Sequence, residues 1–103
     1  MTRSIDYVGS VKKDLQNFPK KPLEKFSQEL DMLKEGLDQY VESKSLHGLG
    51  HGVRELKLNG RPAYRLVYVI RGNVIHILHA FSKTSTGTDR KHESTIKLRY
   101  SNL

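Results

Sequence analysis

The second half of the chain constrains the fold most, because it carries strand patterns: apolar and polar residues alternate with a period of two after Val53, and two longer runs that follow are apolar on both faces. Two turn signals, Asn59-Gly60 and residues 71–73, divide this stretch into three runs, at residues 53–58, 63–70 and 74–81. Neighbouring strands joined by such short turns pair antiparallel. The sequence therefore predicts a three-stranded antiparallel meander.

Helical spacing marks most of the remaining chain. A short helix capped by Ser10 is expected to end at Pro19, and Pro22 suits the first turn of a second helix. The apolar residues of that second helix are Leu23, Phe26, Leu30, Leu33 and Leu37. A short strand is expected around Ile5 and Tyr7, and a C-terminal helix within residues 88–103. Together these patterns predict an α+β fold, with the N-terminal helices packed on one face of a small twisted antiparallel sheet and the C-terminal helix on the other.

Composition and charge narrow the function classes. The chain has 103 residues, which indicates a single domain over residues 1–103, and no Cys, which excludes thiol nucleophiles and Cys-based metal sites. Residues 1–43 hold 7 basic and 8 acidic side chains, whereas residues 44–103 hold 11 basic and 3 acidic ones. The whole net charge of +7 therefore comes from the second part, which favours an anionic partner there. No long apolar run or signal-peptide pattern occurs, so we expect a soluble, cytoplasmic protein without a membrane partner.

Strand parity separates a core face from an ionisable face. If Leu56 and Leu58 point to the core, Glu55 and Lys57 share the opposite face. Arg65 lies on the neighbouring strand among apolar residues, where a long charged side chain is rarely chosen for packing. An ordinary solvated strand face, with Arg65 paired to an acid on the helices, is an equally acceptable interpretation of these residues.

More basic groups can join this face. His79 and Lys83 close the last strand, and further candidates for RNA contact are Lys44, His47, Arg54 and Arg61. Such a cluster suits phosphate. RNA carries its own nucleophile in the ribose 2′-hydroxyl, so a small protein can cleave it by positioning, proton transfer and charge stabilisation. The candidate catalytic residues are therefore Arg65, Lys57, Glu55, Lys83 and His79.

The five His residues do not predict a metal site. His76 and His79 are three apart in a strand and are expected on opposite faces. His47 and His51 lie in a Gly-rich loop at residues 44–52 with no clear third ligand. We expect neither a metal nor another cofactor.

Three stretches resemble the RelE/HigB toxin superfamily, most nearly its phage-derived HigB-like branch. They are residues 44–56, residues 63–70 and residues 72–83, and the resemblance extends from Lys13 to Arg99. It implies a compact α+β domain that acts as a metal-independent endoribonuclease on messenger RNA in the ribosome, with the 2′-hydroxyl as nucleophile. It also implies a toxin–antitoxin hetero-oligomer with a cognate antitoxin, commonly of the helix-turn-helix type.

The resemblance also implies roles for single residues. Arg65 matches an arginine that contacts the scissile phosphate, and Lys57 matches a basic strand position of the active site. Glu55 matches the acid of a Tyr-Glu-Leu motif, while Lys44 and His47 match positions that line the site. His79 and Lys83 match the end of a His-Ala-Phe-x-Lys-Lys motif.

Some residues depart from the family pattern. Arg54 replaces the usual aromatic residue, residues 84–87 dilute a Lys-rich run, and His92 stands where a helix acid is common. Two other functions therefore stay open: a non-catalytic nucleic-acid or ribosome-binding module, and a degenerate toxin that retains only antitoxin binding.

Overall fold

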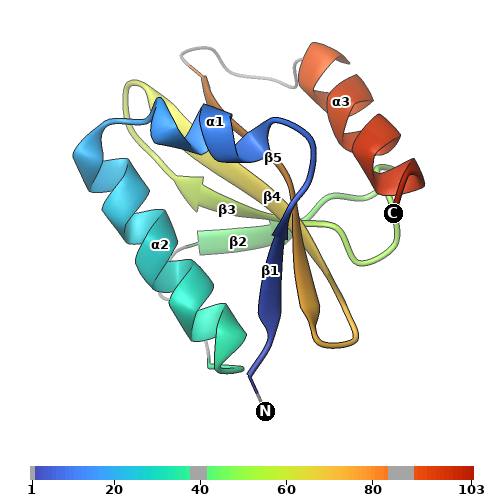
Figure 1. Ribbon diagram of the computed structural model, residues 1–103. Coiled ribbons are helices and arrows are strands. Elements are labelled where there is room, and N and C mark those ends of the chain that lie inside the picture. Colours follow the sequence, from blue (N-terminus) through green and yellow to red (C-terminus); the bar gives the residue numbers. More distant parts are fainter. Residues whose placement is uncertain (1, 38–41, 84–89) are drawn as a thin grey trace.

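The computed structural model describes residues 2–37, 42–83 and 90–103 and contains five strands and three helices (Figure 1). The strands are β1 (Ser4–Tyr7), β2 (Glu42–Ser45), β3 (Arg54–Leu58), β4 (Ala63–Arg71) and β5 (Val74–Lys83). The helices are α1 (Val11–Gln16), α2 (Lys20–Lys34) and α3 (Arg90–Ser101). Each of these helices is too short or too polar to cross a membrane.

All five strands form one sheet in the order β1-β5-β4-β3-β2. The predicted meander is confirmed, since β3, β4 and β5 pair antiparallel. β1 adds a parallel edge strand beside the first half of β5. β2 is a strand that the sequence analysis missed, because residues 44 and 45 were assigned to a loop; it pairs antiparallel with β3 at the other edge.

The N-terminal helices begin where predicted, with two differences. Ser10 precedes α1, but its side chain makes no capping bond and instead accepts a hydrogen bond from Arg99 (3.2 Å). The prediction that α2 extends to Leu37 is wrong. Gly36 has a φ of +73°, a backbone conformation that ends the helix, and the Leu37 side chain is 58% exposed.

Two hydrophobic clusters lie on opposite faces of the sheet, as the sequence predicts. α1 and α2 cover the first face, on which Leu56, Leu66 and Tyr68 are fully buried. α3 covers part of the second face, where Ile96 packs near Val67 and Val69. Figure 1 shows the same layering, with α1 and α2 in front of the sheet and α3 to one side. Positions 88 and 89 of the predicted C-terminal helix lie outside the described residues.

A β-bulge in β5 overturns the prediction that His76 and His79 point to opposite faces. Ile77 pairs with Tyr68 and His79 with Val67, so Leu78 is an extra residue between them. His76 lies opposite Val69 and His79 opposite Val67, and both valines belong to the α3-side cluster. The bulge thus brings both histidines to one face. They have different partners there, since His76 contacts Asp6 (2.8 Å) and His79 contacts His92 (2.7 Å).

The loop between β2 and β3 is fastened to the end of α3 at Gly50. Gly50 has a φ of +145°, and a Cβ atom there would lie 2.7 Å from the Tyr100 ring. The Tyr100 hydroxyl donates to the His51 carbonyl (3.3 Å), and the Arg71 guanidinium lies 4.8 Å from the Tyr100 ring centroid. The loop and α3 therefore hold each other in place.

Gly50→Ala is expected to lower the free energy of unfolding by about 1–3 kcal/mol, because alanine is strained at this φ and its methyl group displaces the Tyr100 ring. Urea denaturation of the two proteins measures the loss. Gly48→Ala is the control for backbone strain alone, since φ is +85° there and no atom lies within 4 Å of the added Cβ. Equal losses in both variants would contradict a specific contact with Tyr100.

Candidate nucleic-acid interface

The strand register gathers five of the predicted site residues on the α3 side of the sheet. Lys57 lies directly opposite Arg65, and Glu55 lies opposite Val67. On the other flank His79 also pairs with Val67, and Lys83 pairs with Ala63. Directly paired residues point to the same face, so Arg65 on β4 shares the face predicted for Glu55 and Lys57 on β3, and the bulge in β5 brings His79 to that face as well. We call the surface of Glu55, Lys57, Arg65 and Lys83 the basic face.

Arg65 is the most firmly held cation of this face. Its guanidinium donates to the carbonyls of Tyr64 (3.0 Å) and Leu58 (3.3 Å) and to the Asn59 side-chain oxygen (3.4 Å). Its Nε lies 3.6 Å from Glu55 Oε1, and both residues are only 7% exposed. The partner is therefore an acid of β3, and the alternative that Arg65 pairs with a helix acid is wrong. Burial of Glu55 likewise excludes an ordinary solvated face.

His79 lies in an aromatic cluster against α3. Its Nε2 is 2.7 Å from His92 Nδ1, and its Nδ1 is 3.5 Å from the Arg99 guanidinium. The Phe81 ring stacks on His92 with centroids 4.0 Å apart, and on His79 at 5.1 Å. Burial lowers the pKa of His79 to about 4, and the neighbouring His92 and Arg99 act in the same direction. At neutral pH His79 is thus an uncharged ring with a partner at each nitrogen.

The four predicted RNA-contact residues are not brought together. Lys44 is exposed on β2 opposite Glu55 and so adjoins the basic face. Arg54 faces the other side of the sheet, opposite Tyr68, where it donates to Ser45 (2.9 Å) and Ser43 (3.0 Å) on β2. Its expected place in the same cluster is therefore wrong, because strand parity directs it away.

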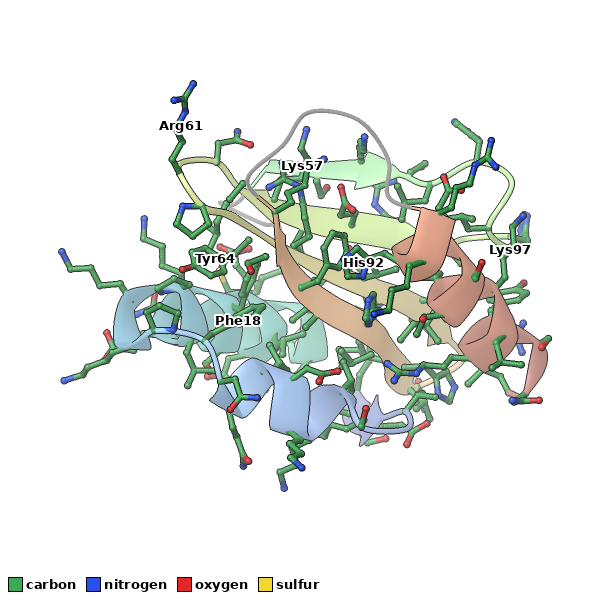
Figure 2. All side chains as sticks on the ribbon, turned by 90° about the horizontal axis from the view of Figure 1, so that it is seen from above. Phe18, Lys57, Arg61, Tyr64, His92 and Lys97 are labelled. Atoms are coloured by element: carbon green, nitrogen blue, oxygen red, sulfur yellow. The ribbon has the colours of Figure 1, made fainter. Side chains whose placement is uncertain are left out.

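His47 and Arg61 lie at the ends of two connections. His47 is exposed and lines a hollow of about 590 Å³ in the loop before β3. Arg61 is exposed between β3 and β4, and Figure 2 shows its side chain directed away from the sheet. Both residues lie in loops beside the strands of the basic face, and neither is among the partners of Arg65 given above.

Sequence analysis missed two groups that organise this surface. Asn59 was identified only as a turn residue, yet its side chain holds Arg65. Arg99 was identified only by helical spacing, yet it donates to the Leu78 carbonyl (2.8 Å) at the bulge and to Ser10. Neither contact is marked in the sequence: Asn59 reaches Arg65 across the hairpin between β3 and β4, and Arg99 binds residues far from it in the chain.

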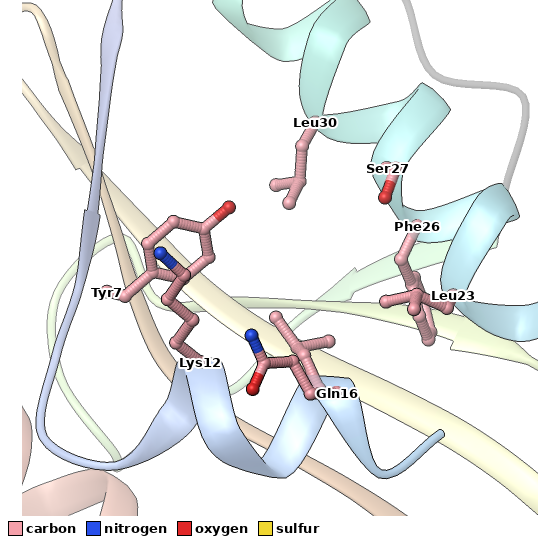
Figure 3. A pocket seen from close by; sticks show the side chains of 8 residues that line it. Tyr7, Lys12, Gln16, Leu23, Phe26, Ser27 and Leu30 are labelled. Carbon is pink, nitrogen blue, oxygen red and sulfur yellow. The ribbon is translucent and has the colours of Figure 1, made fainter. Parts of the chain in front are cut away.

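A small pocket lies on the opposite side of the molecule, between β1, α1 and α2 (Figure 3). Its volume is about 140 Å³, and its lining includes Leu23, Phe26 and Leu30 with Lys12 and Gln16. Tyr7 also lines this pocket, and Lys12 Nζ lies 5.7 Å from the centroid of its ring. The pocket belongs to the helix-covered core and is separate from the basic face.

Comparison with known proteins agrees with this fold. Residues 13–101 match the family model described as Phage derived protein Gp49-like (DUF891). No curated protein matches the chain significantly. Among solved structures, a mutant of the E. coli toxin RelE in the free state has a TM-score of 0.62 at 16% identity, covering 99% of this chain and 97% of that chain.

Two toxin–antitoxin complexes contain similar chains. The E. coli DinJ-YafQ complex gives a TM-score of 0.63 at 18% identity, covering 80% of this chain and 93% of the other. The archaeal RelE-RelB complex from Pyrococcus horikoshii OT3 gives 0.60 at 23% identity, covering 84% and 100%. At such low sequence identities, the structural similarity establishes the fold alone. Because the family model spans most of the sequence, the chain belongs to the phage-derived Gp49-like family, a RelE/HigB-like toxin family.

Proposed function

We propose that the protein is the toxin of a type II toxin–antitoxin system and cleaves messenger RNA on the ribosome. The observation that carries this proposal is the fixed cation Arg65, bound by three oxygens and paired with Glu55, directly beside Lys57. Preorganised positive charge of this kind stabilises the charge that develops on phosphate in the transition state. The 2′-hydroxyl of RNA supplies the nucleophile, so this chemistry calls on no metal or other cofactor.

The exposure of each site residue suggests its role. Arg65 is buried and acts as a fixed charge beneath the phosphate, whereas the half-buried Lys57 and Lys83 contact its oxygens. Glu55 supplies a carboxylate next to Arg65 and is the proposed proton acceptor. His79 acts indirectly, because its two nitrogens are engaged by His92 and Arg99. Lys44 extends the surface for RNA, with His47 and Arg61 at its borders.

The proposed partners are a cognate antitoxin and the translating ribosome. The complexes of similar chains with antitoxins support the first partner. A protein encoded beside this chain, with a helix-turn-helix domain for DNA, is the antitoxin that we propose. The net charge of +7 suits the phosphate-rich surface of ribosomal and messenger RNA. A cytoplasmic location follows from this role.

Lys57→Gln is expected to reduce messenger RNA cleavage by roughly tenfold to a hundredfold, since it removes a phosphate-contacting charge. Lys97→Gln is the matched control: it removes the same charge from an exposed position on α3, well away from Lys57 in Figure 2. Mapping of 5′ ends after induction without antitoxin measures cleavage. Intact messenger RNA and unchanged translation under verified expression of the unaltered protein would refute the proposed function.

A non-catalytic RNA- or ribosome-binding module is the second candidate. The burial of Arg65 and the engaged nitrogens of His79 favour it, because neither group is open to a substrate in this conformation. It predicts that binding falls steeply with salt while no new 5′ ends appear. The same induction experiment therefore separates the two functions.

A further inference from the structure

An open groove runs along the far side of the last half of β5. It has a volume of about 490 Å³ and lies between α1, the turn before α2, the end of β5 and α3. β1 pairs only with residues 74–77 of β5, so the groove begins where this edge strand ends. A space of this size is in the range of small-molecule sites, roughly 300–1,000 Å³.

Aromatic rings form both walls of the groove. Phe18 and Tyr64 stand on one wall with ring centroids 5.0 Å apart, and Phe81 and His92 stand on the other, stacked at 4.0 Å. All four side chains are half-buried, so part of each ring is accessible. Figure 2 shows Phe18 and Tyr64 together, with His92 across the end of β5. Accessible rings of this kind are stacking surfaces for unpaired bases.

Polar groups on α1 and directly after it complete the lining. Asp14 and Asn17 both line the groove, and neither side chain has a partner among the described residues. A carboxylate accepts hydrogen bonds from an exocyclic amino group, and an amide can both donate and accept. Adenine, guanine and cytosine carry such an amino group and uracil does not. The groove is therefore suited to read a base as well as to stack it.

The groove adjoins the basic face through β5. Phe81 lies directly opposite Arg65 in the sheet, and Tyr64 precedes Arg65 in the chain. A strand of RNA with a phosphate at Lys57 and Arg65 can thus place a neighbouring base over the edge of β5. The net charge of +7 favours such a polyanion over an uncharged apolar peptide.

We propose that this groove binds one amino-bearing nucleobase of single-stranded RNA, next to the phosphate held at the basic face. This inference rests on the proposed function for the identity of the RNA site, and it adds a determinant of base preference. Asp14 and Asn17 select the base, while Phe18, Tyr64 and Phe81 stack on it.

The test uses 2′-O-methyl hexanucleotides of adenosine and of uridine, which lack the attacking hydroxyl and cannot be cleaved. The unaltered protein is expected to bind the adenosine oligomer about tenfold more tightly, a difference of about 1.4 kcal/mol. Asp14→Ala, which removes the acceptor for the amino group, should bring the ratio of the two affinities within about twofold. Asp31→Ala, the same loss of charge on the exposed face of α2, should leave the ratio at tenfold. The ratio is the readout because loss of either acid strengthens RNA binding in general.

A second measurement places the base. Addition of adenosine 5′-monophosphate is expected to shift the NMR signals of Ser82 and Thr95, which line the groove, whereas ribose 5-phosphate should not. Absence of these shifts, or an equal affinity ratio in Asp14→Ala and the unaltered protein, overturns the inference. Neither result depends on cleavage. A base preference without new 5′ ends would refute only the ribonuclease activity. Cleavage without a base preference would refute only base binding in the groove.

Discussion

Replacement of Arg65 by alanine is expected to lower messenger RNA cleavage by roughly 10²–10³-fold, the usual effect of removing one preorganised group that stabilises transition-state charge. Arg65 is held by Tyr64, Leu58 and Asn59 before any substrate arrives. Its charge therefore needs no reorganisation when negative charge develops on the phosphate. This preorganisation is the reason for the large expected effect.

The same substitution is also expected to destabilise the fold. Glu55 is 7% exposed, and Arg65→Ala leaves its carboxylate buried without its partner, which typically costs about 3–5 kcal/mol. The sequence places Arg65 among apolar residues and leaves a helix acid open as its partner, but nothing in the local pattern reveals the buried pair with Glu55. A loss of activity in this single variant can therefore be a loss of folded protein.

A double variant separates activity from stability. In Arg65→Gln with Glu55→Gln both charges of the pair are absent, so no buried charge is left unpaired, and urea denaturation should show a smaller loss of stability than in Arg65→Ala. Cleavage should stay as low as in Arg65→Ala. Normal numbers of 5′ ends from a well-folded double variant would rule out a role for Arg65 and Glu55 in the reaction.

The parts of the fold that were predictable are those where local pattern and tertiary packing agree. β3 alternates apolar and polar residues, β4 and β5 are apolar on both faces, and each apolar face meets a helix layer. β2 has the sequence Glu-Ser-Lys-Ser without an apolar residue, so no alternation marks it. It is a strand because its backbone pairs with β3 and because Arg54 binds two of its serines.

The sequence predicts which face of β3 carries the candidate site, but not the contacts that its side chains make. The period of two places Glu55 and Lys57 on one face of β3, and the strand register adds Arg65 of β4 to that face. The bulge at Leu78 is not marked by any glycine or proline, so the parity of β5 changes without a sequence signal. The pair of His79 with His92 depends on where α3 docks, which a pattern within one segment cannot supply.

The stability of the protein is expected to fall as the pH decreases from about 6.5 to about 4, because His79 is buried as a neutral ring. Burial, with His92 and Arg99 beside the ring, lowers the pKa of His79 from 6.5 to about 4. Above pH 6.5 the ring is neutral in the folded and unfolded states, and the contribution to stability is complete. Between the two pKa values only the unfolded chain binds the proton, so the free energy of unfolding decreases with falling pH.

The expected loss from His79 is about 3 kcal/mol over this range, since a change of one in pKa corresponds to about 1.4 kcal/mol. Urea denaturation at pH 7.5, 5.5 and 4.0 measures it. Carboxylates also titrate in this range, so the informative quantity is the difference between the unaltered protein and His79→Gln, which keeps a polar group near His92 but has no titrating ring. That difference should decrease by about 3 kcal/mol from pH 7.5 to pH 4.0.

His76→Gln is the matched control for this measurement. His76 lies on the same strand and face, but its partner is Asp6 of the edge strand β1. The His76→Gln protein should therefore keep the acid-dependent loss of stability that His79→Gln removes. If His79→Gln and the unaltered protein lose the same stability as the pH falls, the His79 ring is not buried as a neutral group. The contact between His79 and His92 of α3 would then differ from the one described here.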